Sequence, residues 1–387
     1  MARRPLWPLL AAFASFGVFW GSWAALVPAM RDRADASVSE LGLAILGVAI
    51  GALPAMLGTG VAVDRWGARL PPATLAAFGL AVLVPLLATS PLQLGAALVV
   101  VGAASGALDV AINAAVSEWE NTTGRRAMSA AHAVYSAGVV VGAIGAGLAR
   151  DLGAGAPLVL GTCAAVLCLA AIPNVSRRRS VAAEADHRPR LDFSRRVLVL
   201  GLLCALGFLV EGGIENWSAL YVEDSLGGSA LAGGLAPGLF AASMVAGRVL
   251  AQALGHRYRD STLLAAAGIV AAVGVSLAAA TDSVVLALVG FSIGGAGVSV
   301  VAPVTFGAAG RDADAARRGV AVGSVTTFGY LGFLVGPPLV GGASGATSLR
   351  AGLLVLVLVA LLLTLASGAV RARSVSGGRR GRSGSSA

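Results

Sequence analysis

Long apolar segments alternate with short polar breaks along the whole chain. A helix needs about 20 apolar residues to cross the roughly 30 Å hydrocarbon core of a bilayer. Cutting the sequence at its charged or turn-rich breaks predicts twelve such helices, at about residues 5–30, 40–63, 70–89, 92–117, 128–149, 157–175, 197–222, 229–254, 261–280, 284–309, 319–343 and 350–370. We therefore expect an all-α integral membrane protein with twelve transmembrane helices.

The composition agrees with this pattern and argues against other classes of protein. Of the 387 residues, 57% are hydrophobic and 12% are charged, and the mean hydropathy of +0.84 is far above that of a soluble domain. The net charge of +9 is also typical of nucleic-acid-binding proteins, but those gather their basic residues on one face or helix. Here the 28 basic residues, all arginine, recur between apolar segments. The lipid bilayer, and no nucleic acid, is the expected partner.

The arginines also predict the orientation of the chain. If the N-terminus is cytoplasmic, 23 arginines fall on the cytoplasmic side, four on the other side, and Arg248 within a span. Such an excess of positive charge on one side is typical of cytoplasmic loops. The count predicts a multi-pass protein of the cell (inner or plasma) membrane with both termini in the cytoplasm.

The longest hydrophilic break, "SRRRSVAAEADHRPRLDFSRR", separates six predicted spans from six others. It predicts an N-terminal six-helix bundle over 1–175, a cytoplasmic linker over 176–196 and a C-terminal six-helix bundle over 197–370. Segments 101–116 and 289–304 share a pair of glycines at the same place in each half, and duplicated halves are typical of transporters. The Arg-, Ser- and Gly-rich tail, 371–387, is expected to be a disordered, basic cytoplasmic segment.

The break between the second and third spans, "GVAVDRWGARL", carries the most specific motif in the chain. Its pattern resembles the signature of the major facilitator superfamily (MFS). The resemblance implies two pseudo-symmetric six-helix bundles and a gate that holds them together in the outward-facing state. The implied gate residues are Gly60, Asp64, Arg65, Gly67 and Arg69. The alternative is an ordinary charged turn that follows the distribution of arginines.

Two shorter stretches, "GALDVAINAAVSE" and "EGGIENWSALY", resemble bacterial MFS permeases near the fucose permease and rhizopine-related groups. This resemblance implies that Asp109 is a fourth-span carboxylate used in proton coupling. The fifth span, "AGVVVGAIGAGLA", lacks the Gly-Pro step that is typical of drug antiporters, which disfavours an efflux pump.

Three acidic residues, Asp109, Glu211 and Glu215, lie inside predicted spans rather than in loops. A charged side chain at mid-bilayer costs at least about 2.5–3.5 kcal/mol on insertion scales, so such residues usually face a polar site and carry function. Asn113 follows Asp109 by one helical turn and shares its face. The glycine pair 212–213 is expected to loosen the helix beside Glu211. We assign proton coupling to Asp109 and Glu211. The alternative is a carboxylate that is only hydrogen-bonded to a neighbouring helix.

Other polar and aromatic residues inside spans are weaker candidates. Aromatic rings bind the apolar faces of sugars and organic cations, but they also pack in cores and in the belts at membrane interfaces. Arg248 is a candidate gating residue that either extends to the interface or pairs with an acid across the gate. His132, Tyr135, Thr326 and Thr327 are lesser candidates. The candidate substrate-binding residues are Trp20, Trp23, Asn113, Glu215, Trp217 and Tyr330.

The sequence therefore predicts a secondary transporter of a small polar organic solute, such as a sugar or sugar derivative, that is coupled to protons by symport. The three cysteines offer neither a disulfide framework nor metal-ligand spacing, and we expect a monomer with no cofactor, no metal and no enzymatic activity. The alternative is a proton-coupled exporter of drugs or metabolites. A membrane sensor and a membrane-bound enzyme are less favoured, because neither a partner domain nor a cluster of active groups at a membrane face is evident.

Overall fold

The computed structural model describes residues 5–175, 191–254, 257–314 and 317–370. The predicted tail and most of the predicted linker lie outside these residues, as does the side chain of Asp64. Twelve helical segments of the described chain are long and apolar enough to cross a membrane. The described residues contain no strand. The prediction of an all-α protein with twelve transmembrane helices is confirmed.

The first six spans occupy the described chain up to Val175. Their elements are α1 (Trp7–Arg33), α2 (Val38–Trp66), the 3-10 turn η1 (Gly67–Arg69), α3 (Leu70–Ala81), the 3-10 turn η2 (Val84–Leu87), α4 (Pro91–Thr123), α5 (Met128–Asp151) and α6 (Ala156–Val175).

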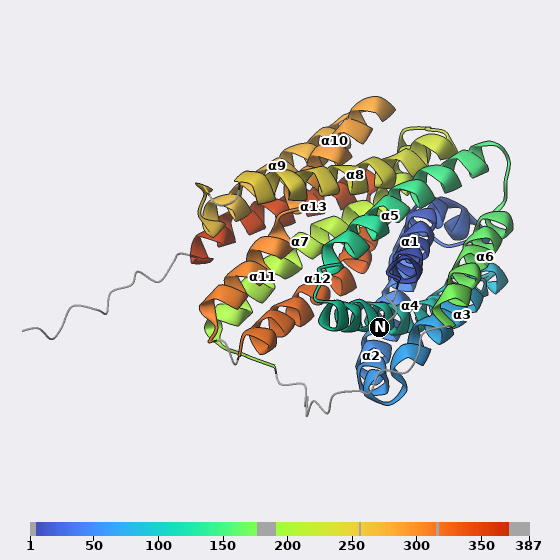
Figure 1. Ribbon diagram of the computed structural model, residues 1–387. Helices are drawn as coiled ribbons and strands as arrows, with labels where there is room; N and C mark the ends of the chain where they lie inside the picture. Colours follow the sequence, from blue (N-terminus) through green and yellow to red (C-terminus); the bar gives the residue numbers. More distant parts are fainter. Residues whose placement is uncertain (1–4, 176–190, 255–256, 315–316, 371–387) are drawn as a thin grey trace, which may run out of the picture.

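The last six spans follow from Arg195. Their elements are α7 (Arg195–Leu220), its π-helical continuation η3 (Tyr221–Ser225), α8 (Ala230–Leu254), α9 (Asp260–Ala280), α10 (Val284–Val298), α11 (Val301–Asp312), α12 (Arg318–Ala346), α13 (Leu349–Ala366) and the 3-10 turn η5 (Ser367–Val370). In Figure 1 these helices, yellow to red, lie beside the first six, blue to green.

Serine caps fix the starts of several spans, including those after the two shortest predicted breaks. A serine hydroxyl at the N-cap accepts a hydrogen bond from a backbone N–H of the first turn that has no partner within the helix. Ser37 does so in a full capping box with Glu40. Ser90 starts α4 and Ser283 starts α10 in the same way. A break with two or three polar residues therefore suffices to separate two apolar segments.

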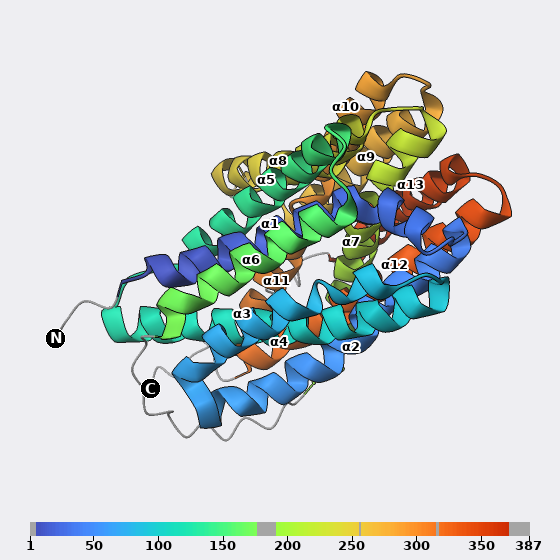
Figure 2. The same cartoon turned by 90° about the vertical axis from the view of Figure 1, so that its right-hand side faces the viewer.

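Glycines set the spacing of the main helix pairs. On α1, a Cβ at Gly17 or Gly21 would collide with the backbone of α5, and Gly142 of α5 is equally tight against α1. The α2–α4 pair is built in the same way, with Gly47 and Gly102 against the facing backbone. Small residues let helices approach closely in lipid, where van der Waals packing replaces the hydrophobic effect. Figure 2 shows α1 running along α5 in a view at right angles to the first.

Two interruptions lie within the last six spans. The tenth span is broken at Ser299 and Val300, between α10 and α11. The seventh ends in the π-helical turn η3, and the loosening expected at the glycine pair 212–213 is not observed. Those two glycines stay α-helical, and their missing side chains make room for Phe333 and Leu356.

The two sets of six helices touch each other closely at one end of the molecule. There α2 packs on α12 and α5 packs on α8. A Cβ on Gly42 would lie 2.8 Å from the carbonyl oxygen of Pro337, and one on Gly147 would lie 2.9 Å from the Cα of Gly234. We call this the closed end. The turn η1 and the described ends of the chain, Pro5 and Val370, lie at the opposite end, because each of the twelve spans reverses direction.

Candidate functional site

Asp109 and Asn113 lie near the middle of α4 and bond to each other. The Nδ2 amide of Asn113 donates to the Oδ1 carboxylate oxygen of Asp109 at 2.9 Å and to the backbone carbonyl of Asp109 at 2.9 Å. Both side chains are half-buried. The two bonds use both donors of the amide and hold the carboxylate in one orientation, while the amide oxygen of Asn113 is left to accept another hydrogen bond.

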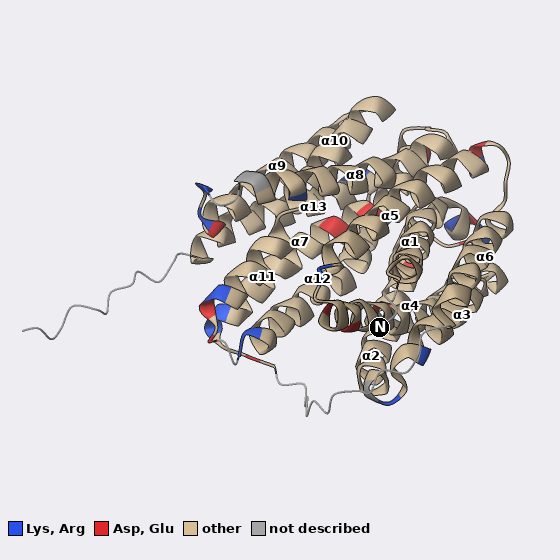
Figure 3. Ribbon diagram, viewed as in Figure 1, with Lys and Arg blue, Asp and Glu red and all other residues tan. Residues whose placement is uncertain are grey.

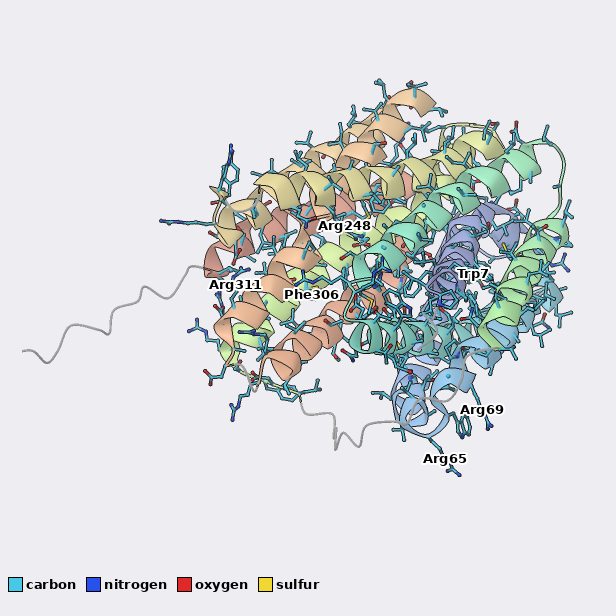
Figure 4. The ribbon with its side chains drawn as sticks, in the orientation of Figure 1. Trp7, Arg65, Arg69, Arg248, Phe306 and Arg311 are labelled. Atoms are coloured by element: carbon cyan, nitrogen blue, oxygen red, sulfur yellow. The ribbon has the colours of Figure 1, made fainter. Side chains whose placement is uncertain are left out.

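Glu211 and Glu215 lie one turn apart on α7, also half-buried. Arg248 of α8 approaches Glu211 with its Nη2 atom 4.0 Å from Oε1. Its Nε donates to the backbone carbonyl of Ser299 at 3.4 Å. That carbonyl has no partner four residues later in the helix, because Pro303 carries no N–H. The acid that Arg248 approaches is thus Glu211 in the same half of the chain, rather than the predicted acid across the gate. Figure 4 shows Arg248 among the helices rather than at their ends.

Two tyrosines lie within electrostatic range of acids from both halves. Tyr135 of α5 lies within electrostatic range of Glu215, Asp109 and Glu211. Tyr330 of α12 lies within range of Asp109 and Glu211. Asp109 and Glu211 do not contact each other directly but share these neighbours. We call this group the central site; it consists of Asp109, Asn113, Tyr135, Glu211, Glu215, Arg248 and Tyr330.

Aromatic rings form the apolar side of the central site. The ring of Tyr330 lies 5.8 Å from that of Phe208 and 6.0 Å from that of Phe333, and the last two stack at 4.6 Å. The ring of Tyr135 lies 5.4 Å from that of Phe16. Figure 3 shows that most charged residues gather at helix ends, while acidic segments on α7 lie within the bundle. The site is therefore polar within an apolar surrounding.

The candidate tryptophans lie in different places. The side chain of Trp23 is 2% exposed and that of Trp217 is fully buried, so both are packed in the core of this conformation. Trp217 fills the space that Gly341 of α12 leaves open, 3.0 Å from where a Cβ would stand. Trp20 is half-buried, edge-on to Phe19 at 5.1 Å between ring centroids. The structure does not bring Trp23 or Trp217 to a surface that a solute can reach.

The motif residues between α2 and α3 lie at the opposite end, away from the central site. A Cβ at Gly60 would meet no atom within 4 Å, and Gly67 starts η1 with φ +45°, a conformation that favours glycine. Arg65 and Arg69 are exposed and point outward in Figure 4. Arg248, the other predicted gating residue, is not close to them in that view.

The closed end carries ion pairs between the halves that the sequence analysis missed. Arg150 of α5 donates to Glu223 of η3 through two bonds of 2.7 and 2.8 Å, and to the carbonyl of Ala25 at 2.7 Å. Arg31 of α1 pairs with Asp224 of η3. The sequence did contain a signal for these pairs. Few arginines are predicted on that side of the membrane, and they stand at span ends that also carry acidic residues. The pairing itself required the fold.

Within the described residues, no three His, Cys, Asp or Glu side chains are grouped so that they could hold a metal ion. The central site instead combines carboxyl, hydroxyl, amide and guanidinium groups from both halves. Those are groups that bind a polar organic solute or carry a proton.

Twelve spans in two sets of six, with a polar site between them at mid-depth, define a membrane transporter. The family model described as the Major Facilitator Superfamily matches residues 9–337. The chain belongs to this superfamily, whose members are transporters and not enzymes.

The chain is similar to other proteins over nearly its whole length. It is 34% identical over 363 residues to an uncharacterized MFS-type transporter of Yersinia pestis, covering 92% of this chain and 93% of that protein. It is 27% identical over 361 residues to the membrane protein MosC of Rhizobium meliloti, covering 91% and 86% of the two chains.

Solved structures share the fold at low sequence identity. The nucleoside transporter NupG has a TM-score of 0.78 at 14% identity, covering 94% of this chain and 98% of that one. A bacterial homolog of the human lysosomal transporter Spinster, in an inward-facing and occupied conformation, has a TM-score of 0.76 at 14% identity, covering 94% and 96%.

Proposed function

We propose that this protein is a proton-coupled importer of a small polar organic solute, with sugars and sugar derivatives as the first class to test. The observation that carries the proposal is the shared neighbourhood of Tyr135 and Tyr330, which come from opposite halves and both lie within range of Asp109 and Glu211. A site built from both halves changes whenever the halves move. Binding there can therefore be coupled to transport.

Asp109 is the residue proposed to carry the proton. A carboxylate at mid-depth is costly when charged and much less so when protonated. Asn113 fixes its orientation through two hydrogen bonds. Glu211 is the second proton-coupling candidate, and its contact with Arg248 is long enough, at 4.0 Å, to be exchanged for another partner.

The solute is proposed to bind between the two tyrosines. Their hydroxyls and the free amide oxygen of Asn113 provide a donor and acceptor set that suits a polyhydroxylated molecule. The rings of Phe208 and Phe333 offer an apolar face nearby, on which a sugar ring can lie. Trp20 is the candidate tryptophan whose partial exposure is compatible with a contact to the solute.

Alternating access is proposed to move the two six-helix bundles, 1–175 and 197–370, against each other. The contacts at the closed end support a state that is open toward the opposite end. The distribution of arginines favours the cytoplasm for that opposite end, and hence cytoplasmic termini in a monomer of the inner or plasma membrane. In the other state, Gly60, Asp64, Arg65, Gly67 and Arg69 are proposed to close the cytoplasmic end.

One observation favours the alternative, an exporter that exchanges protons for a drug or metabolite. The central site holds three acidic residues and one arginine, which suits a cation. Symport and exchange differ in the direction of proton movement when the solute crosses the membrane, so a single assay separates them.

The test is solute-driven proton movement in proteoliposomes that enclose a pH-sensitive dye. Sugars, polyols and their amino and acidic derivatives are first screened for thermal stabilisation of the purified protein at two pH values. We expect that inward movement of a stabilising solute acidifies the lumen. Alkalinisation of the lumen would establish the exporter. Solute movement with no change in lumenal pH would contradict proton coupling.

Asp109→Asn is expected to abolish the acidification, with Asp35→Asn as its matched control. Asp35 is an exposed aspartate between α1 and α2 with φ +48°, a conformation that asparagine also tolerates. Acidification that survives in Asp109→Asn would contradict the assignment of the proton to this residue.

A further inference from the structure

The three acids of the central site differ in how their charge is balanced. Asp109 accepts a hydrogen bond from Asn113 at 2.9 Å. Glu211 has the guanidinium of Arg248 at 4.0 Å. Glu215 makes neither a hydrogen bond nor an ion pair with any residue in the described part of the chain. It is therefore the acid of the site with the least compensation.

Arg248 cannot balance both acids of α7. Glu215 lies within electrostatic range of Glu211 and of Arg248, so one positive charge is shared between two carboxylates of like charge. The guanidinium is directed to Glu211 and to the carbonyl of Ser299 instead. Since an uncompensated carboxylate in a membrane interior is costly, Glu215 is stabilised by taking up either a proton or a further positive partner.

The surroundings of Glu215 suit an organic cation. Tyr135, from the other half of the chain, lies within electrostatic range of Glu215. A tyrosine ring attracts an ammonium group through its electron-rich face. A solute held between Glu215 and Tyr135 would touch both halves of the protein, as transport requires.

We propose that Glu215 determines specificity by binding an ammonium group of the solute, so that the solute class is a small, polar, amine-bearing molecule. Asp109 then carries the proton in the first half, while Glu215 holds the solute in the second. The inference rests on the proposed function only in taking the central site as the place where the solute binds. Proton coupling can fail without affecting it.

The test is thermal stabilisation of the purified protein by matched sets of ligands that differ in one group. One set is glucosamine, glucose and glucuronate; the other is 4-aminobutanol, butane-1,4-diol and 4-hydroxybutyrate. We expect the amine of at least one set to stabilise the protein at concentrations at least about tenfold lower than its neutral and acidic counterparts, because a charge pair is gained. Equal or better stabilisation by a neutral or acidic member, or stabilisation by no amine, would overturn the inference.

Variants of the two α7 acids locate the effect. Glu215→Gln should remove the preference for the amine, whereas Glu211→Gln, one turn away on the same helix, should keep it. Glu215→Asp retains the charge and should restore part of the preference for the amine. Its result shows whether the loss in Glu215→Gln comes from the missing charge or from a protein that does not fold. A preference for the amine that persists in Glu215→Gln would contradict the assignment. A neutral solute that moves with protons would leave the proposed function intact and remove only this inference.

Discussion

The closed end and the central site use the same residue types in different ways. At the closed end, Arg150 and Glu223 form two bonds of 2.7 and 2.8 Å, and their side chains are only 12% and 14% exposed. At the central site, Arg248 and Glu211 approach no closer than 4.0 Å, and Arg248 is 43% exposed. Paired, bidentate bonds hold two helices in place. A single long contact leaves both groups available to other partners.

This difference separates residues that hold a conformation from residues that exchange ligands. The closed end joins the halves through Arg150, Arg31 and closely packed glycines. The central site leaves carboxyl groups only partly satisfied. Changes at the central site should therefore affect coupling and specificity, and changes at the closed end should affect the balance between conformations.

The largest effect is expected from Asp109→Asn, which removes the titratable group but keeps the size of the side chain. Accumulation driven by a pH gradient should fall to the level of protein-free vesicles, while exchange of labelled for unlabelled solute continues. The measurement is uptake of a labelled solute under both conditions. Equal loss of both activities would show that Asp109 does more than carry a proton.

The next largest effect is expected from Gly147→Leu at the closed end. A Cβ at this position would lie 2.9 Å from the carbonyl oxygen of Ala230 and from the Cα of Gly234 in the other half. The larger side chain should hold the closed end apart and block transport while the protein still folds. Gly145→Leu is the matched control on the same helix, since a Cβ there meets nothing within 4 Å. If both variants transport the solute at the rate of the unmodified protein, the close packing of α5 on α8 at Gly147 is refuted.

A smaller effect is expected from removing the closed-end ion pair. Arg150→Ala leaves Glu223 largely buried without its partner, and should lower the free energy of unfolding by about 3 kcal/mol. Arg31→Ala removes a more exposed pair and should cost less than about 1 kcal/mol. Unfolding in detergent, followed by intrinsic fluorescence, compares them. A larger loss for Arg31→Ala than for Arg150→Ala would reverse the ranking of the two pairs.

Much of the fold could be predicted from the sequence because lipid imposes a simple rule on it. Each span must be apolar and about 20 residues long, so the twelve segments stand out, and even the short breaks at Ser90 and Ser283 are correct. The same rule identified Asp109, Glu211 and Glu215 as acidic residues that lie inside spans rather than in loops. The spacing between Asp109 and the amide one turn later indicated that the two share a helix face.

What could not be predicted depends on which helices meet. Arg150 and Glu223 are 73 residues apart in sequence, and only the packing of α5 on α8 brings them together. The burial of Trp217 likewise follows from a glycine on another helix. The contact between Arg248 and the carbonyl of Ser299 also needed the fold. Pro303, which has no N–H for the carbonyl four residues earlier, is the sign in the sequence that the tenth span is broken there.

The central claim, that the central site is reached from the end opposite the closed end, can be tested by labelling a single cysteine. Tyr330→Cys, with Cys163, Cys168 and Cys204 replaced by alanine, is exposed to a membrane-impermeant thiol reagent in vesicles of each orientation. We predict rapid labelling from the side of Arg65 and Arg69 and slow labelling from the closed end, with faster closed-end labelling once Gly147→Leu is added. Rapid labelling from the closed end before that addition would contradict the account.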